Sequence, residues 1–453
     1  MRRLFGTDGV RGVFNTEMDP FMAMRLAMAI GTYLKPGARV LLGRDGRAGS
    51  ETIYLAAAAG LIATGVKVYE TGLTPTPALQ LNVRDRGYDA GVMVTASHNP
   101  PEYVGMKFIL SDGVEAPREV EEEVEKIFYE TSFRKISWRE VQYSLAKDEY
   151  VNEYYINRVV ELVDRNMIAS REFRVVVDPA NSSGLATTPA ILRRLGVKTL
   201  TINADPSPEP WRPYEPTPET ITDLRSIVRE LKADLGVAHD GDADRAMFVD
   251  RYGEAYWGDR DAILLSKHIL LNRKSKMPKR IVTPVSSSVL VEDLLKPYNV
   301  EIVWTRVGSV VIARELMRLG GGICGFEENT GFIYPEHQYV RDGAAKTVLM
   351  LEYLAYEKKS LDELMNELPK MYVIKTRSPT NPVKTERVIE ELKRMFSGER
   401  MITVDGVKVI GRDYWFLVRP SGTEPILRIM IESPSRDKAE EILKEIKSVV
   451  DRY

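Results

Sequence analysis

A pattern of strand, polar loop, helix and second strand occurs three times in this chain, and it limits the available folds more than any other feature. The copies begin at residues 39–43, 173–177 and 280–283, and each leads into a further apolar segment near residue 66, 197 or 300. A crossover helix between two strands of one sheet makes those strands parallel. Three copies spread over 453 residues therefore predict three similar α/β domains.

The last part of the chain has a different pattern. Asp405-Gly406 separates two short apolar segments, which is a strong signal for a β-hairpin. Further strands are expected at 414–418 and 426–432, and the apolar spacing after residue 436 is helical. We therefore expect an α/β protein of three similar domains with mixed sheets, followed by a smaller C-terminal α+β domain. The expected domains span residues 1–148, 149–250, 251–367 and 368–453.

Charge and composition exclude several classes of partner. The net charge is −2, which argues against a nucleic-acid or anionic-membrane surface. The longest apolar run, near residues 55–66, is shorter than the ~20 residues that span a bilayer, and no signal core follows Arg2 and Arg3. The single cysteine, Cys324, excludes a disulfide framework. We expect a soluble cytoplasmic protein with no nucleic acid and no membrane as partners, and an assembly of identical chains is left open.

An acidic loop is the sharpest chemical signal. Asp240, Asp242 and Asp244 alternate directly after the apolar segment 235–238. Carboxylates so close together repel one another unless a cation lies among them, and hard oxygen ligands suit Mg²⁺. An EF-hand is excluded, because its sixth position would be Arg245 instead of glycine. Taken alone, the pattern suits a solvated acidic turn equally well.

A second motif surrounds Ser97. The segment Thr-Ala-Ser-His-Asn-Pro-Pro occupies residues 95–101, after a predicted strand at 91–94. Such a segment could expose the Ser97 hydroxyl at the end of a strand, although an ordinary turn is the favoured interpretation of the segment alone. We expect His98 to point away from Ser97, because neighbours on a strand face opposite sides. A serine-hydrolase triad therefore fits poorly.

Two further loops contain the residue types that bind phosphate. The segment Arg-Pro-Ser-Gly-Thr-Glu-Pro at 419–425, with Arg428 beyond it, combines guanidinium groups, hydroxyls and a glycine. By itself it is also typical of a loop that joins two strands. The glycine-rich segment 320–325 matches Gly-x-Gly-x-x-Gly, but it follows a helix-like segment and enters a strand. That order is the reverse of a dinucleotide site, which we therefore reject.

Together these motifs resemble the α-D-phosphohexomutase family, which includes phosphoglucosamine mutase, phosphomannomutase and phosphoglucomutase. The resemblance covers the whole chain in order, and it is closest to archaeal members. The matching segments are the opening motif at 5–12, the phosphoserine loop at 95–101, the metal loop at 240–245, the sugar loop at 325–331 and the phosphate loop at 419–425. The resemblance implies four domains around a central active-site cleft.

The resemblance also implies roles for individual residues. Ser97 would be the phosphoserine, and with Asp240, Asp242 and Asp244 it would hold Mg²⁺. Lys107 would transfer protons, assisted by His98 and Arg11. Substrate contacts are implied for a further set of residues: Arg245, Glu327, Asn329, Arg419, Ser421, Gly422, Thr423 and Arg428.

The activity implied by the resemblance is an intramolecular phosphoryl transfer in carbohydrate metabolism. Hexose 6-phosphate and hexose 1-phosphate would interconvert through the phosphoserine and a bisphosphorylated sugar, with hexose 1,6-bisphosphate as activator. Asn329-Thr330 replaces the family's usual Ser-Gly in the sugar loop, so use of glucosamine, mannose and glucose phosphates and a strict phosphoglucosamine mutase both stay open. A metal-dependent sugar phosphatase and a non-catalytic sugar-phosphate sensor are the minor alternatives.

Overall fold

The computed structural model describes residues 3–6, 8–141, 145–422 and 424–453. The chain forms two compact units: one combines residues 1–258 with 329–362, and the other combines residues 259–328 with 363–453. The segment 251–367, which we expected to be the third domain, thus contributes to both units. The four domain boundaries stay predictions.

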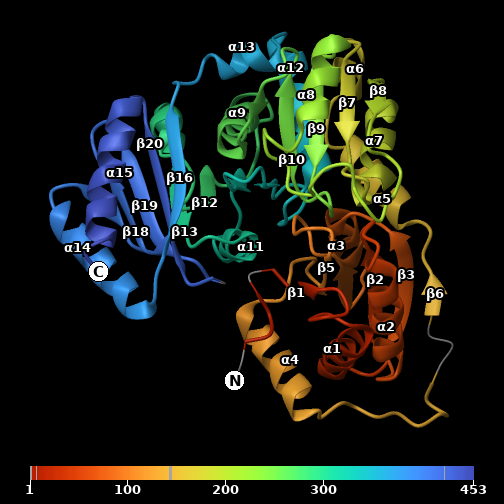
Figure 1. The fold of residues 1–453 in the computed structure, drawn as a ribbon. Helices are drawn as coiled ribbons and strands as arrows, with labels where there is room; N and C mark the ends of the chain where they lie inside the picture. Colours follow the sequence, from red (N-terminus) through yellow and green to blue (C-terminus); the bar gives the residue numbers. More distant parts are fainter. Residues whose placement is uncertain (1–2, 7, 142–144, 423) are drawn as a thin grey trace. The chain divides into compact units, whose positions relative to one another are not determined.

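The first unit begins with a six-stranded mixed sheet in the order β1-β5-β4-β2-β3-β6 (Figure 1). Its elements are β1 (Val10–Val13), α1 (Pro20–Tyr33), β2 (Arg39–Arg44), α2 (Ser50–Ile62), β3 (Lys67–Leu73), α3 (Thr76–Asp85), β4 (Ala90–Val94), β5 (Tyr103–Leu110), α4 (Arg118–Glu130) and β6 (Leu145–Lys147). Val40 and Leu42 join the core with α1, α2 and α4, whereas Leu41 packs towards α3. This alternation buries both faces of β2, as a central parallel strand requires.

The second sheet of this unit has the order β11-β10-β9-β7-β8. Its region comprises α5 (Val151–Val160), α6 (Arg165–Ala169), β7 (Arg174–Asp178), η1 (Ser183–Ala186), α7 (Thr188–Arg194), β8 (Lys198–Thr201), α8 (Thr222–Glu230), β9 (Leu235–His239), β10 (Ala246–Asp250), β11 (Ala255–Tyr256), β15 (Phe332–Ile333) and α12 (Gly343–Glu357). β9 and β10 are antiparallel, and His239 pairs with Ala246. The acidic loop 240–245 is therefore the connection of a hairpin.

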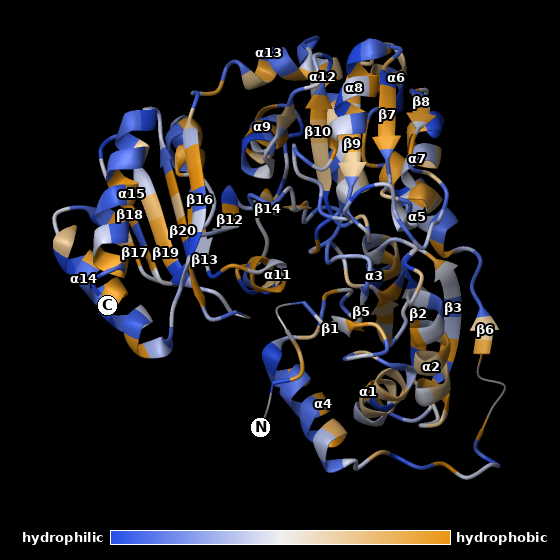
Figure 2. Ribbon diagram, viewed as in Figure 1, coloured by the Kyte–Doolittle hydropathy of each residue, from blue (hydrophilic) through white to orange (hydrophobic). Residues whose placement is uncertain are grey.

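The second unit contains the parallel strands β13, β12 and β14 and an antiparallel sheet in the order β16-β20-β19-β18-β17. Its elements are α9 (Gly258–Leu271), β12 (Arg280–Pro284), α10 (Leu290–Leu295), η2 (Lys296–Tyr298), β13 (Glu301–Thr305), α11 (Ser309–Arg318), β14 (Cys324–Phe326), α13 (Leu361–Met365), β16 (Tyr372–Pro379), α14 (Pro382–Met395), β17 (Arg400–Ile402), β18 (Val407–Ile410), β19 (Trp415–Pro420), β20 (Ile426–Ser433) and α15 (Arg436–Val450). α14 and α15 cover one face of the antiparallel sheet, and Figure 2 shows the apolar strands beneath them.

A buried ammonium group joins the two parts of the second unit. Lys408 on β18 donates to the carbonyl oxygen of Ser287 at 2.6 Å. Its Nζ also lies 4.0 Å from the ring centroids of both Trp304 and Trp415. Burial lowers the pKa of Lys408 to about 7, although Glu432 opposes this effect. The loop after β12 is thereby fastened to the antiparallel sheet.

The sequence patterns correspond to these elements. The strand pairs β2–β3, β7–β8 and β12–β13 are parallel, as the three repeated crossovers predicted. The Asp19 side chain accepts a hydrogen bond from the N–H of Met22 and so caps α1. Gly406 has φ +74° in the hairpin turn, a conformation that glycine adopts without strain. Among the described helices, none has both the length and the apolar character that crossing a membrane requires.

The reactivity of the Cys324 thiol can be measured to test the packing of β14. Cys324 is fully buried, and burial raises the pKa of its thiol to about 12. Because only the thiolate reacts readily, we expect no measurable labelling by a disulfide reagent at pH 8 in native buffer, and one reactive thiol after unfolding in guanidinium chloride. Cys324→Ser is the control for background labelling. Prompt labelling of the native protein would contradict the burial of this strand.

Candidate active site

Ser97 lies just beyond the end of β4 in a strained turn. Its φ is +49°, which is uncommon for a residue other than glycine and costs on the order of 1–3 kcal/mol. The hydroxyl of Thr95 accepts from the N–H of Ser97 at 2.8 Å and donates to Asp45 at 2.7 Å. Because the chain has left the strand, His98 Nδ1 lies 3.4 Å from Ser97 Oγ. The expectation that these side chains point apart was therefore wrong.

Arg47 holds the serine loop in this conformation. Its guanidinium donates to the carbonyl oxygens of Pro100 at 2.8 Å and Asn99 at 2.9 Å, and also to that of Ser97. Asp45 pairs with Arg47 at 3.0 Å, and both side chains are fully buried. A buried and fully bonded guanidinium of this kind fixes the loop geometry. No local pattern in the sequence predicted this role of Arg47.

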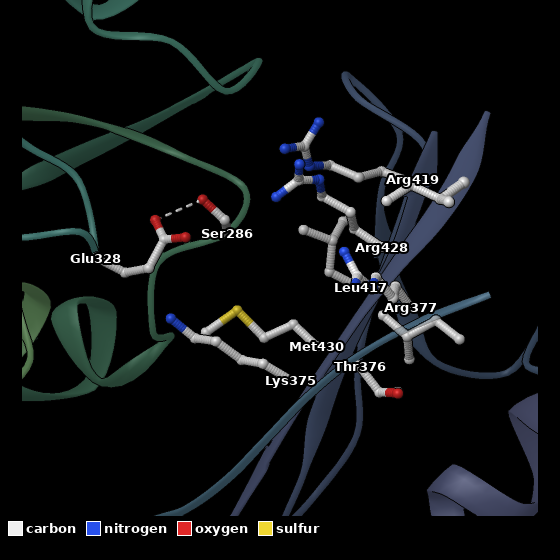
Figure 3. Close-up of a pocket in the computed structure, with 11 residues that line it drawn as sticks. Ser286, Glu328, Lys375, Thr376, Arg377, Leu417, Arg419, Arg428 and Met430 are labelled. Carbon is white, nitrogen blue, oxygen red and sulfur yellow. Dashed lines mark hydrogen bonds between the residues drawn. The ribbon is translucent and has the colours of Figure 1, made fainter. Parts of the chain in front are cut away.

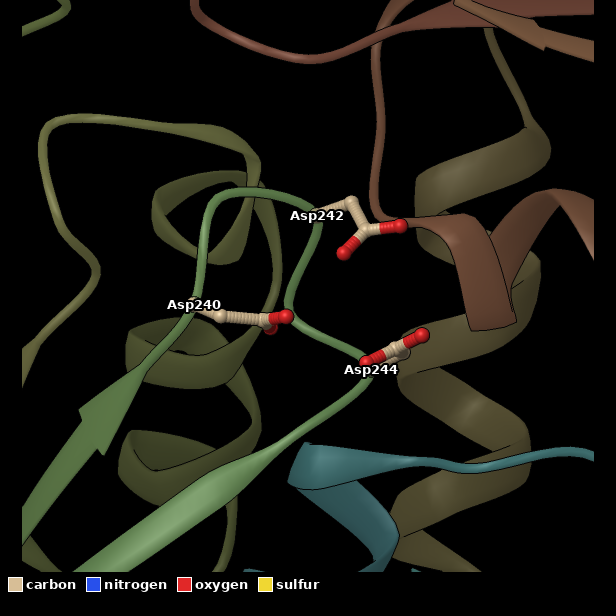
Figure 4. Close-up of side chains that lie close together, drawn as sticks. All are labelled: Asp240, Asp242 and Asp244. Atoms are coloured by element: carbon tan, nitrogen blue, oxygen red, sulfur yellow. The ribbon is translucent and has the colours of Figure 1, made fainter. Parts of the chain in front are cut away.

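The three aspartates converge in the hairpin loop between β9 and β10 (Figure 4). One carboxylate oxygen from each of Asp240, Asp242 and Asp244 lies within 4.8 Å of the others, and all three residues are buried. Ser97 Oγ donates to Asp240 Oδ2 at 3.0 Å. Gly241 permits this approach, because a Cβ there would lie 2.5 Å from the carbonyl oxygen of Ser97. The predicted nucleophile and the predicted metal ligands therefore lie together.

The aspartate cluster fits a divalent cation. Asp242 Oδ1 and Asp244 Oδ1 are buried, and no described residue donates a hydrogen bond to either oxygen. Burial raises the pKa of Asp240 well above its ordinary value, and the neighbouring charges of Asp244 and Asp242 raise it further. Buried acceptors without donors are unfavourable in a folded protein. A hard cation such as Mg²⁺ would satisfy the two oxygens and remove the mutual repulsion.

Lys107 is the central cation of the cluster. Its Nζ lies 3.0 Å from Asp8 Oδ2, 3.0 Å from Asp242 Oδ2 and 3.5 Å from Asp244 Oδ2, and the side chain is fully buried. Burial alone would lower the pKa of Lys107, but the carboxylates of Asp242, Asp8 and Asp244 outweigh it and raise the pKa. The group is therefore held as an ammonium ion. Asp8 belongs to the opening motif, but the sequence did not assign it this role.

Three arginines and a histidine complete this part of the site. Arg245 pairs with Glu215 at 3.0 Å and donates to His98 Nδ1 at 2.9 Å. Arg11 donates to Asn99 at 2.7 Å and pairs with Asp8 at 2.9 Å. Arg341 pairs with Asp244. Burial lowers the pKa of His98 well below its ordinary value, and the charges of Arg245 and Arg11 lower it further. His98 is therefore neutral at neutral pH.

A pocket of about 460 Å³ lies within the second unit. In Figure 3 it is bounded by Arg419 and Arg428 on one side and by Ser286 and Glu328 on the other. Burial lowers the pKa of Arg419, an effect that Arg428 reinforces and Asp405 opposes. The predicted phosphate-loop residues Ser421 and Gly422 follow β19, and the predicted Thr423 lies outside the described residues.

The sugar loop is placed only in part as the sequence suggested. Glu327 is buried at the end of β14, whereas its neighbour Glu328 lines the pocket and accepts a hydrogen bond from Ser286 at 2.8 Å. Asn329 belongs to the first unit, and its Oδ1 accepts from the N–H of Gly331 at 3.3 Å. The sugar contacts of Glu327 and Asn329 stay predictions. The lining residues Lys375 and Arg377 were missed, because no strand was expected at 372–379.

Comparison with known families gives matches along nearly the whole chain. Residues 2–135, 153–253 and 257–372 match the α/β/α domains I, II and III of phosphoglucomutase/phosphomannomutase, and residues 376–449 match the C-terminal domain of the same family. The four matches occur in the family's own order.

Individual relatives agree with this assignment. A phosphoglucosamine/phosphogalactosamine mutase from Sulfurisphaera tokodaii is 45% identical, with 100% of both chains covered. A phosphoglucomutase/phosphomannomutase from Thermococcus kodakarensis is 39% identical over 98% of this chain and 97% of its own. Both organisms carry full-length relatives, so the likeness is not confined to one domain.

Solved structures show the same fold. A phosphoglucomutase/phosphomannomutase family protein from Burkholderia thailandensis has a TM-score of 0.87 at 24% identity, covering 100% of this chain and 98% of its own. A putative phosphomannomutase from Thermus thermophilus has a TM-score of 0.84 at 26% identity, covering 99% and 98%. With the clustered serine, aspartates and lysine, these matches establish that the chain belongs to the phosphoglucomutase/phosphomannomutase family of phosphohexomutases.

Proposed function

We propose that this phosphohexomutase moves a phosphoryl group between the 6- and 1-positions of a hexose by way of a phosphate on Ser97. The observation that carries the proposal is the 3.0 Å contact between Ser97 Oγ and Asp240 Oδ2, inside a buried cluster of three aspartates. A serine phosphate formed there would lie beside the predicted metal ligands. The same position excludes most water, which would otherwise hydrolyse the phosphoserine.

Asp240, Asp242 and Asp244 would hold Mg²⁺ together with the Ser97 phosphate. When bound, the ion would neutralise negative charge on the phosphoryl oxygens during transfer. Arg245 would add a second positive charge, since its guanidinium contacts His98 at 2.9 Å, directly beside the nucleophile. Arg47 would keep the serine loop fixed throughout, so that the phosphoryl group meets prearranged charges.

Lys107 would carry the proton. When Ser97 Oγ attacks a sugar phosphate, the departing sugar oxygen must gain a proton, and Lys107 Nζ, held as an ammonium ion by its carboxylate neighbours, would give it. The Ser97 hydroxyl would lose its own proton to Asp240 Oδ2, which accepts its hydrogen bond at 3.0 Å. In the opposite half-reaction the neutral Lys107 amine would accept the proton of the attacking sugar hydroxyl, and Asp240 would return a proton to Ser97 Oγ. Neutral His98 and charged Arg11 would orient the loop around this exchange.

The bisphosphorylated intermediate must present each of its two phosphates to Ser97 in turn. A site for the phosphate that is not reacting must therefore accept either end of the sugar. Arg419 and Arg428 suit this task, because a guanidinium fork recognises phosphate and not ring stereochemistry. Hexose 1,6-bisphosphate would act as activator by restoring the phosphate on Ser97 after its occasional loss.

We infer that several hexose phosphates are substrates. The relative from Sulfurisphaera tokodaii is named for amino-sugar phosphates, and the one from Thermococcus kodakarensis for glucose and mannose phosphates. A strict phosphoglucosamine mutase is the second candidate, supported by the amino-sugar name of the more similar of these two relatives. A cytoplasmic location and assembly into homo-oligomers are further predictions, independent of the mechanism.

Assays of glucosamine, mannose and glucose phosphates under one set of conditions test the substrate range. We expect turnover of all three, with kcat/KM values within about a hundredfold, because one hydroxyl or amino group changes binding by a few kcal/mol. Turnover of glucosamine phosphate alone would support the strict enzyme. Release of inorganic phosphate without isomerisation would instead support a phosphatase.

Replacement of Ser97 tests the covalent step. Ser97→Ala should lower isomerase activity more than about a thousandfold, since no other described group occupies the nucleophile position. Mass spectrometry of the wild type should show one phosphoryl group that the variant lacks. Ser448→Ala, which removes an exposed hydroxyl on α15, should match the wild type. Substantial isomerase activity in Ser97→Ala would overturn the mechanism.

Removal of the cation tests the aspartate cluster. Exhaustive chelation should abolish turnover, and added Mg²⁺ should restore it. Calorimetric titration with Mg²⁺ should show one site in the wild type and at least about tenfold weaker binding in Asp244→Asn, which loses one charged ligand. Asp223→Asn, an exposed change on α8, should bind Mg²⁺ normally. Equal Mg²⁺ binding by the wild type and Asp244→Asn would exclude this assignment.

A further inference from the structure

Three arginines form a row across the antiparallel sheet of the second unit. Arg377 on β16 pairs with Arg428 on β20, and Arg428 pairs with Arg419 on β19. Residues that pair directly in an antiparallel sheet project from the same face, with Cβ atoms about 5 Å apart. The three side chains therefore belong to one face of the sheet, and all three line the pocket. In Figure 3 the guanidinium groups of Arg419 and Arg428 lie next to each other.

This arginine row is unfavourable without an anion. Like charges directly opposite one another destabilise a sheet. Arg428 pairs with Glu424 at 3.0 Å, and Arg419 lies 3.7 Å from Asp405. Arg377 has no ion-pair partner in the part of the chain that the structure describes. The positive charge of the row is therefore only partly balanced by the protein.

The rest of the pocket increases the positive charge. Lys375 lies two residues before Arg377 on the same face of β16, opposite Met430. Four basic side chains thus line the pocket, and Glu328 is the single carboxylate among its described lining residues. A solvated surface arginine needs no such arrangement. Three guanidinium groups in register around a pocket instead match the several oxygens of a phosphate.

We propose that Arg377 is a third guanidinium of the phosphate site and binds, with Arg419 and Arg428, the sugar phosphate that is not reacting. The inference deepens the proposed function and rests on it. The sequence motif at 419–425 supplies Arg419, and Arg428 follows in the next strand, but β16 brings a residue from more than 40 positions earlier. The site is therefore a face of the sheet and not a single loop.

The change Arg377→Gln removes one charged fork from an exposed position. The non-reacting phosphate is the same in the ground state and the transition state, so its contacts affect KM and leave kcat nearly unchanged. We expect KM for glucose 6-phosphate to rise about tenfold, with kcat within about twofold of the wild type. Arg377→Lys keeps the charge but loses the two-pronged guanidinium group, so its KM should lie between those of the wild type and Arg377→Gln.

Binding without turnover separates this proposal from the proposed function. After exhaustive chelation, which stops turnover, calorimetric titration of glucose 6-phosphate should give a Kd about tenfold higher for Arg377→Gln than for the wild type. Arg394→Gln, which removes an exposed arginine from α14 paired with Glu391, is the matched control and should not change Kd. Thermal unfolding of all variants verifies the fold.

The outcomes are distinct. A KM and Kd for Arg377→Gln within twofold of the Arg394→Gln values would overturn the role of Arg377, and so would a loss confined to kcat. A wild type without mutase activity would overturn the proposed function. In that case a Kd that still depends on Arg377 would preserve the phosphate site itself.

Discussion

The buried meeting of Ser97 with Asp240 is the contact on which the rest of this site depends. It brings the end of one sheet against a hairpin loop of another, and it places three carboxylates where water cannot screen them. Such a cluster persists only among opposite charges. Three basic residues supply these opposite charges. Lys107 lies on β5, Arg245 lies at the end of the acidic loop, and Arg341 lies in the segment before α12. The segment 329–362 thus belongs with the first unit for electrostatic as well as packing reasons.

The elements that the sequence predicted best are those whose signal is local. The proline after Asp19, the hairpin at Asp405-Gly406 and the three crossover repeats depend on a few neighbouring residues, and all appear in the structure. The motifs around Ser97 and Asp240 became informative only in combination, because each also suits a plain turn. The resemblance to the family implied that these two motifs lie together, and in the structure Ser97 contacts Asp240.

Other residues could not be found from local patterns. Asp8 contacts Lys107, 99 positions later, and Arg47 contacts Asn99, 52 positions later, so these spacings carry no recognisable period. β16 was missed because it is an edge strand that is little buried on either face. The alternation of apolar and polar residues in such a strand is weak, so its sequence resembles that of a polar linker. Because Arg377 lies on β16, its place in the pocket was missed as well. His98 was misjudged for a different reason: the rule of alternating strand side chains ends where β4 ends, and Ser97 lies beyond that point in a left-handed conformation.

The Lys408 ammonium between Trp304 and Trp415 has a consequence for recognition. It ties the loop that carries Ser286 to the sheet that carries the arginine row, and Ser288 reinforces the connection through Glu432. The two walls of the phosphate pocket are therefore set opposite each other before any ligand arrives. The entropy cost of ordering these two walls is already included in the free energy of folding. The pocket is therefore preorganised, and an anion that binds loses little affinity to rearrangement of the walls.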